Sequence, residues 1–111
     1  MTETLDPEDA KIITLARSIR ARNGSAEGAA VRDETGRTYA ASGVDLPSLQ
    51  LTAVQVAVAM AVSSGAKALE ATALVTEADG PGEQDLSVMQ DLRNGTLLLA
   101  APDGSLKGRH V

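Results

Sequence analysis

Apolar residues recur at helical spacing near the start of the chain, in a stripe made of Ile12, Leu15, Ala16 and Ile19. Asp6 and Pro7 stand before this stripe, where an N-cap and a first helical residue are expected. Asn23 and Gly24 follow it, and glycine commonly ends a helix. The pattern therefore predicts a helix from about residue 7 to residue 23.

The middle of the chain changes from a strand pattern to a long apolar segment. Residues 26–33 predict a strand, 34–37 a tight turn and 38–41 the partner strand of a hairpin. Residues 43–48 are expected to form a connection. The next segment, 49–64, is apolar on nearly every side and predicts a helix packed in the middle of the structure.

The last third alternates strand and helix patterns. Residues 69–76 predict a central strand, 83–93 a short helix and 96–101 a leucine-rich strand, before a turn at 102–104 and a basic tail. The resulting order, α-β-β-α-β-α-β, predicts an α/β fold with a mixed sheet covered by helices. The length of 111 residues fits a single domain over 1–111.

Composition adds a constraint on how stable this core can be. The chain contains no Phe and no Trp, and Tyr39 is its one aromatic residue. A buried Leu or Val contributes roughly 1.5–3 kcal/mol to stability, and a buried alanine contributes less because it removes far less apolar area from water. A core rich in alanine is expected to be marginally stable alone, which favours a homo-oligomer, a dimer or a tetramer.

Charge and cysteine content exclude several classes of partner and site. The net charge is −5, with acidic and basic residues interspersed, so no nucleic-acid surface is expected. The chain has no cysteine, which excludes disulfides and thiolate chemistry. Its acidic start does not resemble a signal peptide, and the apolar run 51–62 is too short to span a membrane. We therefore expect a soluble, cytoplasmic protein with no membrane partner.

Several stretches, taken together, resemble the cytidine deaminase family. Segment 27–39 reads Glu-Gly-Ala-Ala-Val-Arg-Asp-Glu-Thr-Gly-Arg-Thr-Tyr, similar to the family's V-G-A-A-L strand, acidic-Gly-Arg turn and tyrosine-bearing strand. Segment 48–57 reads Ser-Leu-Gln-Leu-Thr-Ala-Val-Gln-Val-Ala, where the family has G-L-T-L-C-A-E-R-V-A. A strand then runs into Asp79-Gly80-Pro81, and 84–90 replaces the family's P-C-x-x-C-R-Q helix. This resemblance, from about 15 to 99, implies a three-layer α-β-α sandwich.

The same resemblance places the family's functional positions on residues of other chemistry. The first zinc ligand falls on Thr52, and the proton-shuttling glutamate falls on Val54. The two cysteines of the second motif fall on Asp85 and Val88. The pair that holds the ribose falls near Gly43 and Asp45, a possible vestigial ligand pocket.

These replacements predict the loss of the family's chemistry. Zinc deamination needs three N or S ligands, an open coordination position and a carboxylate to move the proton. Val54 cannot transfer a proton, and the sole histidine, His110, is expected on a mobile end. From the residues we therefore expect no zinc, no other cofactor, no catalytic residue, and a protein that is not an enzyme.

Three functional hypotheses remain open at this point. The first is a catalytically inactive relative of cytidine deaminase that acts as a structural or protein-interaction module, as a homo-oligomer or with an unknown protein partner. The second is binding of a nucleoside or another small molecule without turnover, with Asp45 contacting a hydroxyl. The third is a subunit of a mixed oligomer that borrows residues from a true deaminase.

Overall fold

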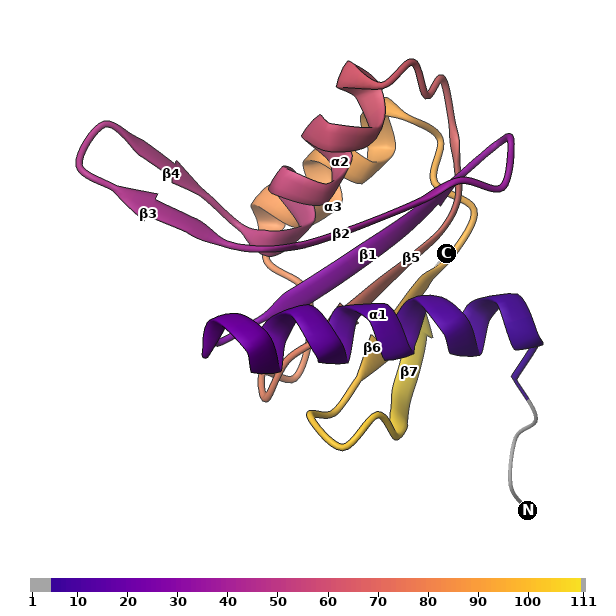
Figure 1. Ribbon diagram of the computed structural model, residues 1–111. Coiled ribbons are helices and arrows are strands. Elements are labelled where there is room, and N and C mark those ends of the chain that lie inside the picture. The colour runs from indigo at the N-terminus through magenta and orange to yellow at the C-terminus, as the bar shows by residue number, and fades with distance from the viewer. Residues whose placement is uncertain (1–4, 111) are drawn as a thin grey trace.

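The computed structural model describes residues 5–110 as a five-stranded mixed sheet with helices on both faces (Figure 1). The helices are α1 (Pro7–Asn23), α2 (Ala53–Ser63) and α3 (Glu83–Asp91). The strands are β1 (Gly28–Asp33), β2 (Thr38–Ser42), β3 (Val44–Leu46), β4 (Leu49–Leu51), β5 (Leu69–Val75), β6 (Leu97–Ala100) and β7 (Leu106–His110). The main sheet has the order β2-β1-β5-β6-β7, so β5 is central, as predicted. Among the strands that the structure describes, only β5 and β6 pair in parallel.

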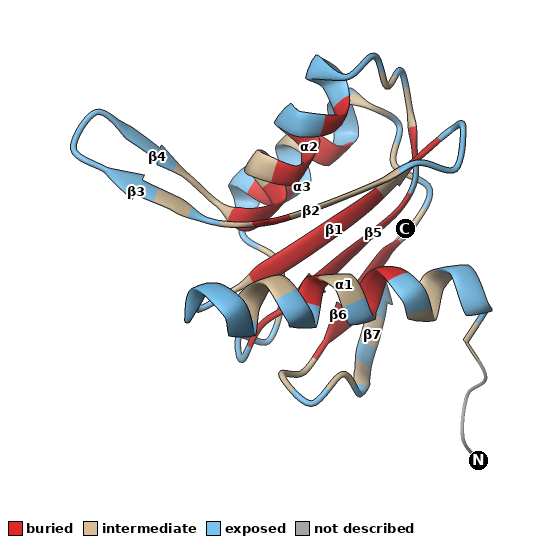
Figure 2. Cartoon of the chain, in the orientation of Figure 1, coloured by how far each residue is buried: buried red, intermediate tan, exposed pale blue. Residues whose placement is uncertain are grey.

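Two separate apolar cores fill the space on the two faces of the sheet. Along β1, Val31 packs with α2 and Met89 of α3, whereas Ala30 faces α1 with Ile12. This alternation follows the two-residue period of a strand. Figure 2 shows the buried positions as a red stripe on α1 and along the central strands. The expected three-layer α-β-α sandwich is thus confirmed.

The first helix ends where its local chemistry predicts. Asp6 caps it by accepting a hydrogen bond from the Glu8 backbone N–H at 2.8 Å. Gly24 ends it in the left-handed conformation, with φ of 60°. The turn after β1 is equally local: the buried carboxylate of Asp33 accepts hydrogen bonds from the Thr35 and Arg37 backbone N–H groups and the Thr35 hydroxyl.

The connection predicted at 43–48 is instead a two-stranded hairpin that projects from the body of the molecule (Figure 1). Leu46 pairs with Leu49, so Pro47 and Ser48 form a two-residue turn. As a consequence α2 begins at Ala53 rather than at residue 49. The predicted helix started too early because Leu49-Gln50-Leu51 alternates apolar and polar residues, which suits a strand.

Two further expectations need correction. The apolar helix α2 is not enclosed on every side, because Met60 is 40% exposed and Val62 is 47% exposed. The basic tail is an ordered edge strand, β7, whose His110 pairs with Leu97 of β6. Lys107 fixes this strand by donating hydrogen bonds from Nζ to the carbonyls of Thr76 and Ala78. Within residues 5–110, no helix combines the length and apolar character needed to cross a bilayer.

Candidate functional site

The start of α2 is built around Thr52, which is the N-cap of the helix. Its hydroxyl oxygen accepts a hydrogen bond from the Gln55 backbone N–H at 3.1 Å. The Gln55 side chain accepts one in return from the Thr52 backbone N–H at 2.9 Å. This reciprocal pair is a capping box, so Thr52 sits at the helix end, not inside the helix as the sequence predicted.

The same hydroxyl joins α2 to α3. Thr52 Oγ1 donates a hydrogen bond to Asp85 Oδ1 over 2.6 Å, and Asp85 is only 2% exposed. Asp85 lies in the first turn of α3, where a negative charge is favoured by the helix dipole. Two positions that the family resemblance assigned to two halves of one site are therefore in direct contact.

The other two degenerate positions lie beside this contact and are apolar. Val54 is fully buried in the core between α2 and the sheet. Val88 is half-buried and packs against the same core from α3. Neither side chain offers an atom that could hold a metal or move a proton.

The residues present do not fit a zinc ion. Protein zinc sites use cysteine thiolates, histidine nitrogens and carboxylates in a tetrahedral set. Around Thr52 the structure supplies one hydroxyl and one carboxylate, already bonded to each other. In the part of the chain that the structure describes, no group of three or more His, Cys, Asp or Glu side chains could hold a metal ion.

An open cleft lies at this end of α2, between the helix start and the base of the β3–β4 hairpin. It consists of two adjoining hollows of about 340 and 430 Å³ that share Val44, Asp45, Leu51 and Thr52. Both Gly43 and Asp45, the proposed pocket residues, line the first hollow. The volumes fall within the range of small-molecule sites.

Sequence reasoning missed most of the polar lining of this cleft. Glu27 lines the first hollow, and three glutamines line the second: Gln50, Gln55 and Gln84. These side chains come from four separate elements or loops, so no local motif marks them. The carboxylates and side-chain amides there can accept hydrogen bonds from hydroxyls. The amides can also pair with a ligand group that presents one donor and one acceptor side by side.

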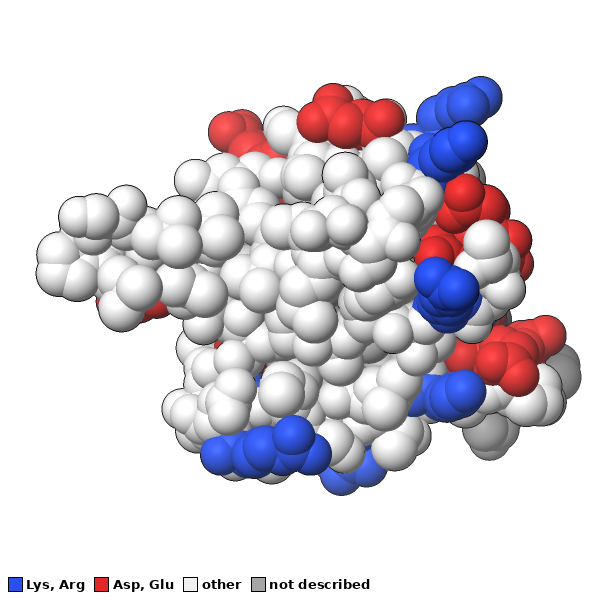
Figure 3. Space-filling view, turned by 45° about the horizontal axis from the view of Figure 1, so that its top comes forward, with Lys and Arg blue, Asp and Glu red and all other residues white. Residues whose placement is uncertain are grey.

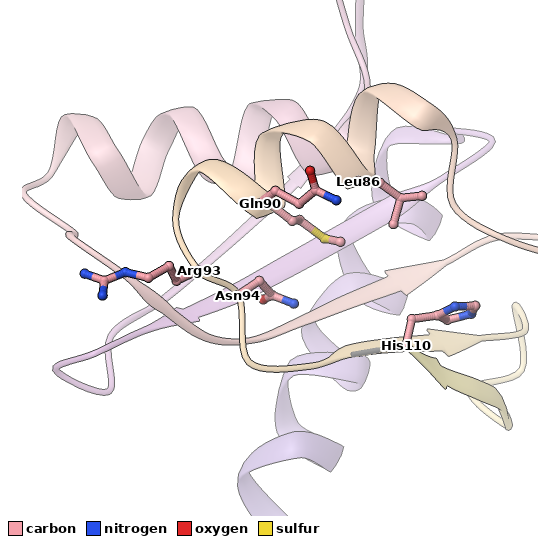
Figure 4. A pocket seen from close by; sticks show the side chains of 6 residues that line it. Leu86, Gln90, Arg93, Asn94 and His110 are labelled. Atoms are coloured by element: carbon pink, nitrogen blue, oxygen red, sulfur yellow. The ribbon is translucent and has the colours of Figure 1, made fainter.

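A separate hollow of about 250 Å³ lies between α3 and β7, away from Thr52 (Figure 4). Its six lining residues are Leu86, Met89, Gln90, Arg93, Asn94 and His110. None of them is acidic, and Figure 4 shows the Arg93 side chain pointing away from His110. The hollow therefore offers no acid–base pair.

Comparison with known proteins identifies the fold. The cytidine deaminase-like family model matches residues 5–104. The structure is similar to a cytidine deaminase from Burkholderia pseudomallei, with a TM-score of 0.76, 22% identity, and coverage of 90% of this chain and 89% of that one. It is also similar to the Mycobacterium tuberculosis cytidine deaminase, with a TM-score of 0.70, 23% identity and coverage of 92% and 90%.

A third similar structure is the Mycobacterium leprae cytidine deaminase, with a TM-score of 0.70, 19% identity, and coverage of 95% of this chain and 93% of that one. No curated protein shows a significant match to the sequence.

These comparisons correct one expectation. The replaced site residues predicted a protein that is not an enzyme, and that prediction is wrong by this measure. The matching family is cytidine deaminase-like, and the structures that share its fold are cytidine deaminases, which are enzymes. The physical reason for the error is that replaced ligands exclude a zinc-dependent route only, which is narrower than excluding catalysis.

Proposed function

Since the chain belongs to the cytidine deaminase-like family, we propose that it binds a nucleoside in the cleft at the start of α2. One observation carries this proposal: the two adjoining hollows open onto Thr52 and Asp45, at the positions matched to the family's reacting and ribose-holding ends. In this binding mode the carboxylates of Asp45 and Glu27 accept hydrogen bonds from ribose hydroxyls. The glutamine side chains of the second hollow pair with the polar edge of the base.

Calorimetric titration with cytidine and uridine tests the proposal. We expect saturable heat, and Asp45→Asn should weaken binding about tenfold, because a charged acceptor is replaced by a neutral one. Asp79→Asn, which changes an exposed aspartate outside the cleft, is the matched control and should bind like the wild type. Absence of heat at millimolar nucleoside contradicts the proposal.

The same samples can be used to measure whether bound cytidine is converted to uridine. Release of ammonia and the absorbance change from cytidine to uridine are followed after the titration. Product formed without added zinc would assign a metal-independent reaction to the cleft, while binding alone leaves the proposal of a nucleoside site intact.

A second candidate function is protein interaction through a homo-oligomer. The observation that favours it is the exposure of two large apolar side chains at the hairpin tip, Leu46 at 55% and Leu49 at 48%. Exposed apolar residues gathered on one feature mark interaction surfaces in many proteins. A cytoplasmic location remains a prediction from the sequence alone.

A further inference from the structure

Two arginines of α1, Arg17 and Arg20, line a hollow of about 230 Å³ between this helix and the turn that joins β6 to β7. The other lining residues of this arginine hollow are Thr14, Ser18, Ala21 and Pro102. No acidic side chain lines it. Figure 3 shows Lys and Arg side chains along the lower edge of the molecule, with no Asp or Glu side chain beside them. The hollow is therefore a local positive site on a chain whose net charge is −5.

Both guanidinium groups are held in place by backbone carbonyls outside the helix. Arg17 Nε donates a hydrogen bond to the Pro102 carbonyl at 3.1 Å, and Arg20 Nε donates one to the Ala26 carbonyl at 3.1 Å. The turn leaves room for Arg17 at Gly104, where a Cβ would lie 2.8 Å from Arg17 Cδ. Because the two side chains are already oriented, they lose less conformational entropy when they bind a ligand.

The terminal nitrogens of these two guanidinium groups have no protein acceptor. Within the described residues, Arg17 and Arg20 form no ion pair, and their hydrogen bonds use Nε alone. The carboxylate of Asp103, in the same turn, accepts hydrogen bonds from the backbone N–H and the hydroxyl of Ser105 instead. The helix dipole favours arginine in the last turn of α1, which includes Arg20, but it does not account for Arg17. The hollow thus presents donors that only a ligand or water can satisfy.

We propose that the arginine hollow binds a phosphate group, either as the free ion or as the monoester of a small molecule. The planar fork of a guanidinium matches phosphate oxygens in a bidentate arrangement. Arg17 and Arg20 are three residues apart, so they are neighbours on the helix surface and can bond to one anion together. The hollow is smaller than the roughly 300–1,000 Å³ of sites for drug-sized ligands, which suits a small anion. It shares no lining residue with the cleft at Thr52, so it is a site distinct from the proposed nucleoside site.

A two-dimensional NMR titration of isotope-labelled protein tests the site through the side-chain Nε–H signals of Arg17 and Arg20. Inorganic phosphate and glycerol phosphate are added separately, at a pH of about 8, above the second pKa of about 6 of a phosphate monoester. Sodium chloride at matched ionic strength is the control for screening. We expect saturable shifts of both signals. Saturation by inorganic phosphate identifies the free ion as a sufficient ligand, and saturation by glycerol phosphate alone identifies an organic phosphate. No saturation with either, or the same shifts with chloride, overturns the proposal.

Variants then separate this hollow from the general charge of α1. Arg17→Gln and Arg20→Gln should each weaken phosphate binding about tenfold or more, because each removes charge-assisted hydrogen bonds. Arg22→Gln removes the same charge from an exposed arginine of α1 outside the hollow, and should bind within about twofold of the wild type. Circular dichroism checks that each variant is folded, and the wild-type titration tests the site without any variant. Equal weakening by Arg17→Gln and Arg22→Gln overturns the proposal, because general charge would then attract the anion.

Discussion

At the scale of single residues, Thr52 satisfies two partners with one hydroxyl. Its oxygen accepts from the Gln55 backbone N–H, and its proton goes to the buried carboxylate of Asp85. The contact joins the first turns of α2 and α3, which are 33 residues apart in sequence. This hydrogen bond therefore links the starts of the two helices.

Thr52→Val should lower the free energy of unfolding by about 1–3 kcal/mol, because it removes a helix cap and leaves a buried carboxylate without its donor. The shape of the side chain is kept, so packing is not the cause. Urea denaturation followed by circular dichroism measures the change. Thr14→Val is the control, since the Thr14 hydroxyl donates only to the Ala10 carbonyl on an exposed helix face. Equal losses for the two variants would contradict a special role for Thr52.

The free energy of unfolding should depend on pH through the carboxyl group of Asp33. Burial by itself raises the pKa of the Asp33 carboxyl, but hydrogen bonds from Thr35 and Arg37 outweigh it and hold the pKa below its usual value. The folded-state pKa is thus lower than the unfolded-state pKa of about 3.9. The resulting stabilisation is present above that unfolded value and is lost as the pH falls through the lowered folded value.

Asp33→Asn should therefore unfold more easily than the wild type at pH near 7, by at most about 1 kcal/mol, because a charged acceptor becomes neutral. The difference should shrink as the pH falls below about 4. Thermal unfolding across this range measures it. Asp91→Asn, at an exposed aspartate, should show a smaller difference at neutral pH. A gap for Asp33→Asn that persists undiminished in acid argues against the charge as the cause.

At the scale of elements, α1 packs so closely on β1 that only glycine fits between them. A Cβ on Gly28 would lie 2.1 Å from the Ala16 carbonyl oxygen and 2.9 Å from Arg20 Cβ. The helix backbone cannot move aside without leaving the sheet. The contact also explains why β1 begins with glycine at this point.

Gly28→Ala should lower the free energy of unfolding by about 1–3 kcal/mol or more, the cost of overpacking a well-filled interior. Gly108→Ala is the control in another strand, since a Cβ there meets no atom within 4 Å. Chemical denaturation of both variants makes the comparison. If Gly28→Ala is as stable as Gly108→Ala, the close approach of α1 to β1 is not a constraint on the fold.

Elements with local signals were predictable, and those set by distant contacts were not. Asp6, Pro7 and Gly24 mark the ends of α1 through caps that the sequence displays directly. The strand β7 lacked such a signal, because Lys107 and His110 make an edge strand resemble a polar tail. Its position is fixed by pairing with β6 and by the bonds of Lys107 to the loop after β5.

The candidate site, too, was predictable from the sequence only in part. The resemblance placed positions 52 and 85 in one site, and in the structure Thr52 donates a hydrogen bond to Asp85 over 2.6 Å. The hydrogen bond itself was not predictable, since no local pattern relates a threonine to an aspartate in another helix. The glutamines lining the cleft were missed for the same reason.

At the scale of the whole molecule, two thin cores share one sheet. Alanine occupies many of the buried positions on both faces, including Ala29, Ala30 and Ala57. Small side chains let the helices approach the sheet but remove little apolar area from water. The composition of the core therefore limits how much the burial of apolar area can stabilise this fold.

Tyr39 of β2 lines an apolar groove together with Val56 and Met60 of α2, and the chain has no tryptophan and no phenylalanine. The near-ultraviolet absorption and intrinsic emission of the entire protein therefore arise from a single phenol ring. Events at the Thr52 cleft or around His110 leave the protein's own signal unchanged unless they alter the surroundings of that ring. The absorption and emission of the unlabelled protein therefore report on the groove that Tyr39 lines, so Tyr39 is a natural site-specific optical probe.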